Sequence, residues 1–308
     1  MKHIFIINPN SGVKSREKLL ADIKSACEAE SADYEIYYTT CKRDAERFVR
    51  ERAEKEQGEQ LRFYACGGDG TVEEVANGAF GFANAEVAAV PSGTGNDFIR
   101  NFSPIAAFSN IIKQIRGKVM ELDLIRYNDR FAVNTINIGF DCSVVDRVEK
   151  MRRFPLIRGA KAYTICALIE LVPMPKCVLR LLHGEKEETR RLTLCSIANG
   201  RFCGGGYKSN PLAKLDDGKL DVFLADGKVG RIRFLRMLGG YRKGTLLDSE
   251  KYFRFVSYFQ SEKLALSADK PIMFCADGEV MHADKLDLSV CSRALRFVVP
   301  EGANLVSV

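Results

Sequence analysis

The sequence has 308 residues, which predicts two domains of ordinary size. Hydrophobic residues make up 46% and charged residues 28%, so the composition is that of a globular protein with a substantial core. This excludes an intrinsically disordered chain, a collagen and a coiled coil. The net charge is +6, from 46 basic and 40 acidic residues.

We predict neither an export signal nor a membrane-spanning segment. The apolar start at residues 4–7 is too short for a signal peptide. The most apolar later region, 163–172, contains Glu170 and is shorter than the ~20 residues that a spanning helix needs. The 10 cysteines include no C-x-x-C pair and the 3 histidines are far apart, so a zinc site or a histidine-dependent triad is not expected. We expect a cytoplasmic protein with reduced thiols.

Strand and helix signals alternate over the first third of the chain. Apolar runs predict strands at 2–7, 34–39, 61–66 and 86–90, and helical spacing predicts helices at 16–29 and 43–57. Thr71 and Glu74 match the T-x-x-E capping box that starts a helix. A further helix is predicted from Ser103-Pro104 to Gly117. This alternation predicts a doubly wound α/β domain with a mostly parallel sheet, which binds its ligand at the carboxyl ends of the strands.

After about residue 120 the pattern becomes β-rich. Helical patterns remain only at 144–171 and 229–243, whereas strand-like runs lie at 119–127, 130–138, 177–183, 190–198, 219–225, 263–268, 271–276 and 285–290. We predict an α/β domain over 1–122 and a β-rich, β-sandwich-like domain over 123–295, packed closely with a cleft between them. The run at 296–300 is a candidate for one more strand of the first domain, which would then include 296–308.

Two segments concentrate the positive charge. Residues 147–161 hold six cations and one acid, and residues 228–243 hold six cations and no acid. Such clusters suit an anionic surface such as acidic lipid head groups, although two solvated faces explain them equally. The cations at 228, 231, 233 and 236 do not collect on one side of a helix, which argues against a simple amphipathic membrane helix. No recognition motif supports nucleic acid as a partner.

A glycine-rich segment, Gly67–Thr71, lies between a predicted strand and a predicted helix. Glycine lets backbone N–H groups approach an anion, and the helix N-terminus adds its positive end. The segment therefore predicts a phosphate cradle, although a tight strand-to-helix turn needs the same glycines. Asp69 would repel a phosphate unless a cation lies between them, which predicts Mg²⁺.

A second glycine-rich segment, Ser92–Asp97, follows the next predicted strand, and the parallel topology brings it beside the first. A third turn, Asn8–Gly12, ends the first strand with small hydrogen-bonding residues. Neither glycine segment has the spacing of a P-loop or of a Rossmann dinucleotide fingerprint.

The ordered motifs N-P-x-S-G, G-G-D-G-T-x-x-E and S-G-T-G-N-D-F-x-R resemble the diacylglycerol kinase catalytic domain of soluble bacterial lipid kinases, which are related to sphingosine and ceramide kinases. The resemblance covers nearly the whole chain. It continues through Gly139–Asp141, Gly204–Gly206, Leu215–Asp221 and Asp277–Glu279. The G-G-D-G element alone is less specific, because NAD kinases and phosphofructokinases share it.

The resemblance implies ATP and Mg²⁺ as cofactors of the first domain. Asp69, Asp97 and Asp123 are implied in an aspartate and water network around the nucleotide's Mg²⁺, although Asp123 also reads as a strand-end carboxylate without a role. Glu73 stands where the family often has asparagine, and a solvent-facing side chain would account for it. The residues implied in nucleotide binding are Asn8, Asn10, Ser11, Gly12, Thr40, Gly67, Gly68, Asp69, Gly70, Thr71, Glu74, Ser92, Gly93, Thr94 and Asp97.

In the second domain the resemblance implies two further sites. Asp277 and Glu279 are catalytic together with Asp69: one of the pair accepts the proton of a lipid hydroxyl as its oxygen attacks the γ-phosphorus, and the other orients it. A plain hairpin turn accounts for the same residues. A structural Mg²⁺ is implied at the Asp217 side chain and at the carbonyls of Lys214 and Lys219, where a turn is again the simpler account.

These observations predict an ATP-dependent lipid kinase that associates peripherally with an anionic membrane and phosphorylates a lipid alcohol such as diacylglycerol to give phosphatidic acid. A homodimer is possible. Two alternatives stay open: an NAD kinase-like enzyme with a soluble acceptor, and a non-catalytic sensor of nucleotide or lipid.

Overall fold

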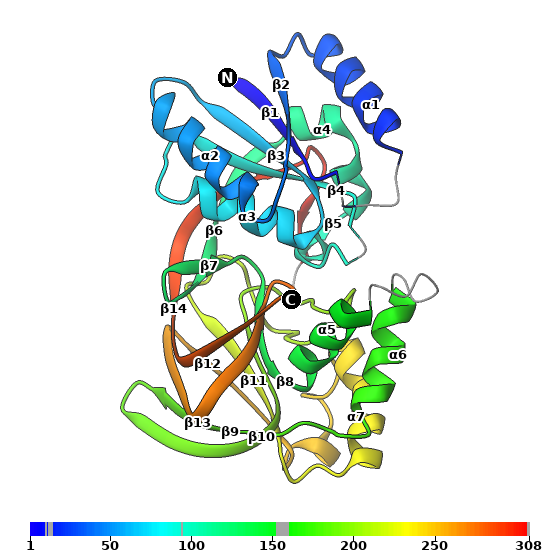
Figure 1. Cartoon of the computed structure of the whole chain (residues 1–308), viewed down its shortest axis with the longest axis vertical. Helices are drawn as coiled ribbons and strands as arrows, with labels where there is room; N and C mark the ends of the chain where they lie inside the picture. Colours follow the sequence, from blue (N-terminus) through cyan, green and yellow to red (C-terminus); the bar gives the residue numbers. More distant parts are fainter. Residues whose placement is uncertain (10, 12–14, 94, 152–159, 307–308) are drawn as a thin grey trace. The chain divides into compact units, whose positions relative to one another are not determined.

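The structure is a computed structural model that describes residues 1–9, 11, 15–93, 95–151 and 160–306 (Figure 1). It divides into two compact units. Unit 1 comprises Met1–Asp123 and Ser292–Ser307, and unit 2 comprises Leu124–Cys291. Among the described residues, no helix has both the length and the apolar character needed to cross a membrane.

Unit 1 alternates strands with helices along the chain, as predicted. Its elements are β1 (Lys2–Ile7), α1 (Arg16–Ala29), β2 (Tyr34–Tyr38), α2 (Asp44–Lys55), β3 (Leu61–Gly67), α3 (Asp69–Ala79), β4 (Ala85–Pro91), η1 (Phe98–Asn101), β5 (Phe102–Ser103), η2 (Ile105–Ser109), α4 (Ile111–Ile115), the start of β6 (Lys118–Tyr127), the end of β14 (Glu279–Val299) and β15 (Asn304–Leu305).

The sheet of unit 1 has the strand order β2-β1-β3-β4, with every pair parallel. α1 and α4 pack on one face of this sheet, and α2 and α3 pack on the other (Figure 1). This arrangement confirms the doubly wound α/β fold. Because both faces are covered, β1, β3 and β4 are buried along nearly their whole length, and their carboxyl ends meet at one edge.

A buried ion pair anchors the returning end of the chain to this sheet. Phe297 of β14 pairs in parallel with Val87 of β4. Arg62 of β3 lies 2.8 Å from Glu86 of β4, and Arg296 reaches the same carboxylate at 3.1 Å. Each partner of the buried pair is therefore satisfied, which such a pair requires.

The helix predicted from Ser103-Pro104 to Gly117 is interrupted. η2 ends at Ser109, and α4 begins after Asn110, whose side chain accepts a hydrogen bond from the N–H of Lys113 at 3.1 Å. Asparagine is a strong N-cap residue, so a new helix starts where the prediction had one continue.

Unit 2 is β-rich with three long helices, and its fold confirms the predicted class. Its elements are the end of β6, β7 (Arg130–Ala132), β8 (Thr135–Gly139), α5 (Phe140–Met151), α6 (Ala160–Glu170), β9 (Cys177–His183), β10 (Lys186–Ala198), β11 (Leu220–Asp226), α7 (Arg231–Lys243), η3 (Glu250–Tyr252), β12 (Val256–Ser261), β13 (Lys263–Ala276) and most of β14.

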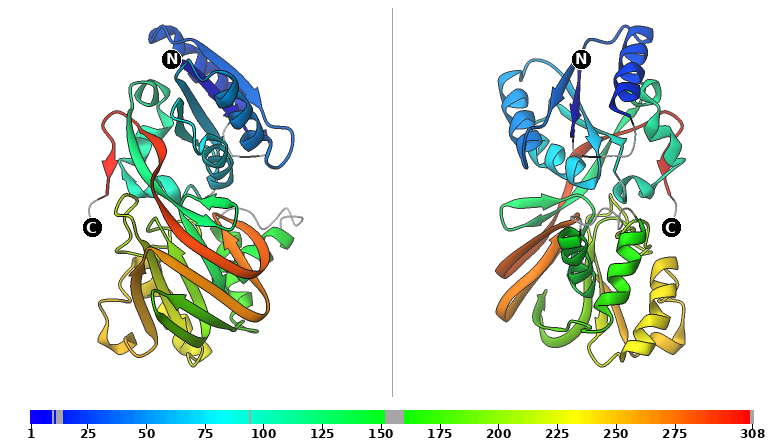
Figure 2. Two further views of the ribbon diagram at one scale, coloured as in Figure 1. Left: turned by 90° about the vertical axis from the view of Figure 1, so that its left-hand side faces the viewer. Right: turned by 45° about the vertical axis from the view of Figure 1, so that its right-hand side comes forward.

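The strands of unit 2 follow the order β12-β11-β10-β8-β13-β14, and β9 joins β10 to β13. All of these pairs are antiparallel. The interior is filled by apolar side chains of the strands, and α5, α6 and α7 cover the opposite face of β10 and β11 (Figure 2). The unit therefore has a sandwich-like core and a separate helical layer.

Several element boundaries in unit 2 differ from the prediction. The predicted strands 263–268 and 271–276 form one strand, β13, with a register shift between Ser267 and Ile272. The run at 285–290 is part of the longer β14, and β12 was not predicted. The helix predicted over 144–171 is represented by α5 and α6, and residues 152–159 between them lie outside the described part of the chain.

Candidate active site

Three turns meet at the carboxyl edge of the unit 1 sheet. Ser11, in the turn after β1, donates its hydroxyl to the carbonyl of Asn8 at 3.0 Å and lies 3.3 Å from the hydroxyl of Ser92, in the turn after β4. The N–H of Asn8 donates to the carbonyl of Cys66 in β3 at 3.3 Å. The predicted turn after β1, Asn8–Gly12, is thus held to the predicted turn after β4, Ser92–Asp97, by a hydrogen bond between their serine hydroxyls.

The two glycine segments pack backbone against backbone. The N–H groups of Ser92 and Gly93 donate to the carbonyl of Gly67 at 2.9 and 3.3 Å. A β-carbon built on Gly93 would lie 2.5 Å from the Cα of Gly68, closer than real β-carbons approach. Glycine at 93 is therefore required by this close approach, and the predicted proximity of the two segments is confirmed.

Two carboxylates converge on Gly95. A β-carbon built there would lie 3.0 Å from Oδ2 of Asp69 and 3.4 Å from Oδ2 of Asp97. The other oxygen of Asp69 accepts the N–H of Phe98 at 3.1 Å, which fixes the carboxylate at the start of η1. Arg100 donates to the carbonyl of Gly95 at 3.2 and 3.0 Å, and its Nε lies 3.4 Å from Oδ1 of Asp97.

This arrangement fits a hard cation held together with a phosphate. Asp69 is the first residue of α3, so its carboxylate lies where the helix presents its positive end. Mg²⁺ in nucleotide sites is typically held by one or two protein carboxylates, with phosphate oxygens and water as its other ligands. Within the described ranges, no group of three or more His, Cys, Asp and Glu side chains gathers into a metal centre. Asp69 and Asp97 match the two-carboxylate kind of site.

The predicted capping box is wrong. α3 begins after Gly68, and no side chain caps its N-terminus. Glu74 instead accepts the N–H groups of Arg43 and Ala45, at 3.0 and 3.3 Å, at the start of α2. The carboxylate of Glu74 thus satisfies two N-terminal amides of a neighbouring helix, and a pattern within one helix cannot reveal that.

Thr40 also serves α2. Its hydroxyl and its N–H donate to Oδ2 of Asp44 at 2.9 and 2.8 Å, and Tyr37 and Arg47 bind the same carboxylate. Burial would raise the pKa of Asp44, but these hydrogen bonds outweigh burial and lower the pKa to about 2. The structure therefore gives Thr40 a partner in Asp44, a residue that the sequence did not single out.

Glu73 is buried, so the expectation of a solvent-facing side chain is wrong. It is 4% exposed in α3, and its carboxylate accepts a hydrogen bond from the amide of Asn77 at 3.1 Å. The glutamate that replaces the family's frequent asparagine is thus buried in unit 1, and its hydrogen-bond partner Asn77 lies one helical turn further along α3.

Asp123 is buried in β6, and its Oδ1 accepts the N–H of Arg293 at 2.8 Å. Arg293 has a φ of 54°, a left-handed conformation that is uncommon outside glycine and asparagine. This contact joins the end of the first part of unit 1 to its returning segment. Of the other predicted nucleotide-binding residues, Asn10, Gly12 and Thr94 lie outside the described residues.

In unit 2, Asp277 occupies the turn between β13 and β14. Its carboxylate accepts the N–H groups of Val133, Asn134 and Thr135 at 2.6, 3.1 and 2.9 Å, and its own N–H donates to Thr135 at 3.0 Å. The φ of Asp277 is 45°, so the predicted hairpin turn is present. Three amide donors stabilise the ionised carboxylate and bind the 133–135 segment to this turn.

The predicted cation turn at Lys214–Lys219 is followed closely in sequence by a buried carboxylate with one oxygen left unpaired among the described residues. Asp217 accepts the N–H of Lys219 at 3.1 Å, as expected for a turn. Asp221, two residues after Lys219, is fully buried, and burial raises its pKa. Its Oδ1 accepts hydrogen bonds from Tyr258 and Gln260, whereas its Oδ2 has no hydrogen-bond partner in the described part of the chain. A buried carboxylate oxygen without a partner is costly, so a cation bound at Asp217 and the carbonyls of Lys214 and Lys219 fits this turn.

A second buried acid of unit 2 was missed from the sequence. Asp141 of α5 receives a hydrogen bond from the hydroxyl of Tyr241 in α7 at 2.7 Å. Burial raises the pKa of Asp141 to about 6, and the hydrogen bond offsets burial only in part. A cavity of about 20 Å³ lies beside it, lined by Tyr163, Tyr207 and Gly204 among others. Its tyrosine partner lies 100 residues further along the chain, so local sequence carries no signal for the pair.

Two family models match this chain. The diacylglycerol kinase catalytic domain matches residues 2–127, and the YegS C-terminal NAD kinase beta sandwich-like domain matches residues 134–299. The chain belongs to the YegS-like lipid kinase family. The match places the glycine segments in the catalytic-domain model and the Asp277–Glu279 turn in the C-terminal model.

Curated relatives agree with this family, and a solved structure shares the fold. The "probable lipid kinase YegS-like" of Pseudomonas aeruginosa is 30% identical over 249 residues, which cover 79% of this chain and 78% of the relative. The "putative lipid kinase YtlR" of Bacillus subtilis is 26% identical over 315 residues, which cover 96% and 99%. A crystal structure titled as a "putative diacylglycerol kinase" from Bacillus anthracis shares the fold, with a TM-score of 0.76 at 22% identity over 99% of this chain and 97% of that one.

Proposed function

We propose that this protein is an ATP-dependent lipid kinase that transfers the γ-phosphate to a lipid hydroxyl, with diacylglycerol as the acceptor and phosphatidic acid as the product. The observation that carries the proposal is the convergence of the Asp69 and Asp97 carboxylates on Gly95, beside the N-terminus of α3. Membership of the family supports the lipid acceptor. Because ATP is a cytoplasmic substrate, the reaction belongs at the cytoplasmic face of a membrane.

The roles in unit 1 follow from charge and backbone geometry. The glycine amides of Gly67–Gly70 and the positive end of α3 would bind the phosphates. Asp69 and Asp97 would hold Mg²⁺, which neutralises charge on the phosphates when it is bound. Arg100, held at the carbonyl of Gly95, balances the two acids and keeps the second glycine segment in place.

In unit 2 we assign the proton-accepting role to Glu279 and the orienting role to Asp277. Asp277 accepts three backbone N–H groups, which fix its carboxylate at the turn and suit it to orient the acceptor. Glu279 is half-buried at the start of β14, two residues further on, and as the other carboxylate of the pair it takes the proton of the lipid hydroxyl in this proposal.

The test is ADP release with ATP and Mg²⁺ in mixed micelles, over a panel of diacylglycerol, phosphatidylglycerol, an isoprenoid alcohol, a sphingoid base and NAD. We expect diacylglycerol to stimulate release most. Asp69→Asn and Glu279→Gln should each lower kcat by about 10²–10⁴-fold with little change in melting temperature. Asp284→Asn, at an exposed position of the same strand as Glu279, is the matched control and should keep full activity.

The outcomes separate the alternatives. Stimulation by NAD alone would replace the proposal with a soluble acceptor, and no stimulation by any acceptor would favour a sensor. Asp277→Asn should lose stability first, because it leaves a backbone N–H of 133–135 without its carboxylate. If Glu279→Gln keeps the parent rate while Asp277→Asn abolishes turnover without unfolding, the two roles are reversed.

A further inference from the structure

α6 carries an exposed apolar face. Ile165, Leu168, Ile169 and Val172 at its C-terminal end are 40%, 53%, 36% and 70% exposed. Ile165, Leu168 and Ile169 have the spacing i, i+3 and i+4 and lie on one side of α6, the pattern by which a helix normally buries itself against a core, and Val172 follows in the turn after the helix. The core-facing side of α6 is instead supplied by Cys166. No described residue of unit 2 therefore buries this apolar stripe.

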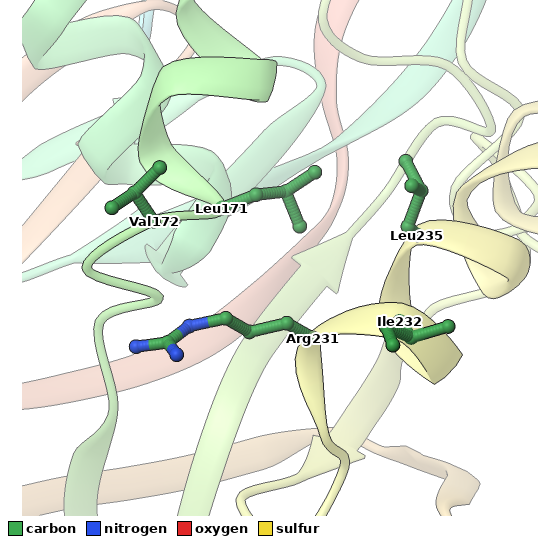
Figure 3. Close-up of a pocket in the computed structure, with 5 residues that line it drawn as sticks. All are labelled: Leu171, Val172, Arg231, Ile232 and Leu235. Carbon is green, nitrogen blue, oxygen red and sulfur yellow. The ribbon is translucent and has the colours of Figure 1, made fainter.

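The N-terminal turns of α7 extend this face. Ile232 is 71% exposed and Leu235 is 48% exposed. Together with Leu171, Val172 and Arg231 they line a groove of about 320 Å³ between the end of α6 and the start of α7 (Figure 3). Figure 3 shows Leu171, Val172, Ile232 and Leu235 as an apolar rim, with the guanidinium of Arg231 extending toward the α6 side. Large exposed apolar patches usually mark an interaction site.

Among the described residues that line the groove, the one charged residue is the cation Arg231. Arg231 and Arg236 are exposed and flank Ile232 and Leu235 on the same half of α7. The segment 228–243 contains no acid. The cations of α7 do not form a stripe on that helix. In the folded unit, however, they lie next to a continuous apolar face that α6 and α7 build together.

We propose that this α6–α7 face, defined by Ile165, Leu168, Ile169, Val172, Ile232, Leu235 and the flanking arginines, docks on an anionic phospholipid bilayer. This proposal rests on the proposed function and identifies the surface through which the kinase binds the membrane that contains its lipid substrate. Apolar side chains enter the boundary between head groups and acyl chains, while the arginines bind lipid phosphates. A second copy of the chain does not suit the face, because both copies would bring a cationic, acid-free 228–243 segment into one interface.

Docking needs both kinds of contact. A single apolar anchor gives only marginal, reversible membrane binding, and a second signal such as basic residues is required to stabilise it. Loss of the apolar residues or of the arginines is therefore expected to lower binding, and salt should weaken only the electrostatic part.

The experiment is sedimentation with large vesicles, without nucleotide, comparing phosphatidylcholine with a mixture containing about one third phosphatidylglycerol. We expect the parent protein to bind the anionic vesicles at least about tenfold more tightly than it binds the phosphatidylcholine vesicles. Ile232→Asp with Leu235→Asp should lower that affinity by about tenfold or more, and Arg231→Gln with Arg236→Gln should lower it severalfold. Leu168→Asp tests the α6 side independently. Leu182→Asp, at a 45% exposed position of β9, is the matched control and should bind like the parent.

Equal binding of neutral and anionic vesicles, or parent-like binding by both the α6 and α7 variants, would overturn the proposal. A parent dimer that these variants dissociate, without vesicle binding, would assign the face to a second copy. Activity on a short-chain diacylglycerol dispersed as monomers should be unchanged in the α7 variant, while activity on vesicles falls. If vesicle binding follows the expectation but no lipid is phosphorylated, docking stands and the proposed function fails.

Discussion

Acidic side chains have different surroundings at the carboxyl edge of the unit 1 sheet and among the helices α5, α6 and α7 of unit 2. In unit 1, the carboxylates of Asp44 and Asp69 accept hydrogen bonds from backbone amides, and Asp44 accepts a further one from the hydroxyl of Thr40. In unit 2, Asp141 is buried among aromatic side chains with a hydrogen bond from Tyr241, and apolar residues of α6 and α7 face outward.

The difference shows that burial alone does not decide the state of an acid. Asp44 has a pKa lowered to about 2, whereas Asp141 has a pKa raised to about 6, although both are buried. The two pKa values move in opposite directions because Thr40, Tyr37 and Arg47 all donate to Asp44, whereas Tyr241 alone among the described residues donates to Asp141. An edge rich in amide donors and carboxylates suits phosphates with a cation, and an apolar face flanked by arginines suits anionic lipid.

Among changes that alter packing alone, the largest effect is expected where two backbones touch. Gly93→Ala places a β-carbon 2.5 Å from the Cα of Gly68, so the glycine segments must separate. We expect kcat to fall about hundredfold and the free energy of unfolding to fall by about 1–3 kcal/mol, measured by ADP release and urea unfolding.

Two other glycines sharpen this prediction. A β-carbon on Gly58 or on Gly70 meets nothing within 4 Å. Gly58→Ala is the control and should keep full activity. Gly70→Ala should keep or gain stability by about 0.4–1 kcal/mol, yet lose activity if phosphates approach the start of α3. Full activity in both Gly70→Ala and Gly93→Ala would remove the phosphate cradle from this edge.

The contrast between the two buried acids predicts opposite pH dependences of stability. The pKa of Asp141 is higher in the folded protein than the ordinary value of 3.8, so its contribution is present below pH 3.8 and is lost as pH rises through about 6. Asp141→Asn should therefore be more stable than the parent by about 3 kcal/mol near pH 8, and this gain should vanish toward pH 4.

Asp44→Asn is the comparison of opposite sign. The pKa of Asp44 is lowered to about 2, so its contribution is present above pH 3.8 and is lost as pH falls through about 2. The variant should be less stable at neutral pH by about 2 kcal/mol, a loss that shrinks in acid. Urea unfolding of parent and variants across pH measures both, and parallel curves for the two variants would contradict the comparison.

The smallest effect concerns Glu74. Glu74→Gln weakens the hold on the amides of Arg43 and Ala45 and should cost about 1 kcal/mol. Glu51→Gln, at an exposed position in α2, should change stability by less than about 0.5 kcal/mol. A rise in the KM for ATP beyond that stability loss would give Glu74 a role in nucleotide binding as well.

Local patterns were sufficient for the class of the fold and for the glycine segments. Strand and helix periodicities are set by residues that are neighbours in the chain, and the conformational demands of glycine at the ends of β3 and β4 are equally local. Parallel topology then placed the two segments together, as the contact between Gly68 and Gly93 confirms.

Those local patterns could not predict which side chains contact one another when they are far apart in the sequence. Glu74 looked like a cap of its own helix and binds α2, and Asp141 finds Tyr241 from a helix far along the chain. The exposed face of α6 and α7 has the spacing of a buried one, because periodicity records that a helix has an apolar side and not whether anything covers it. Partners that meet only after folding leave no trace in the residues beside them, so the tertiary structure alone assigns these contacts.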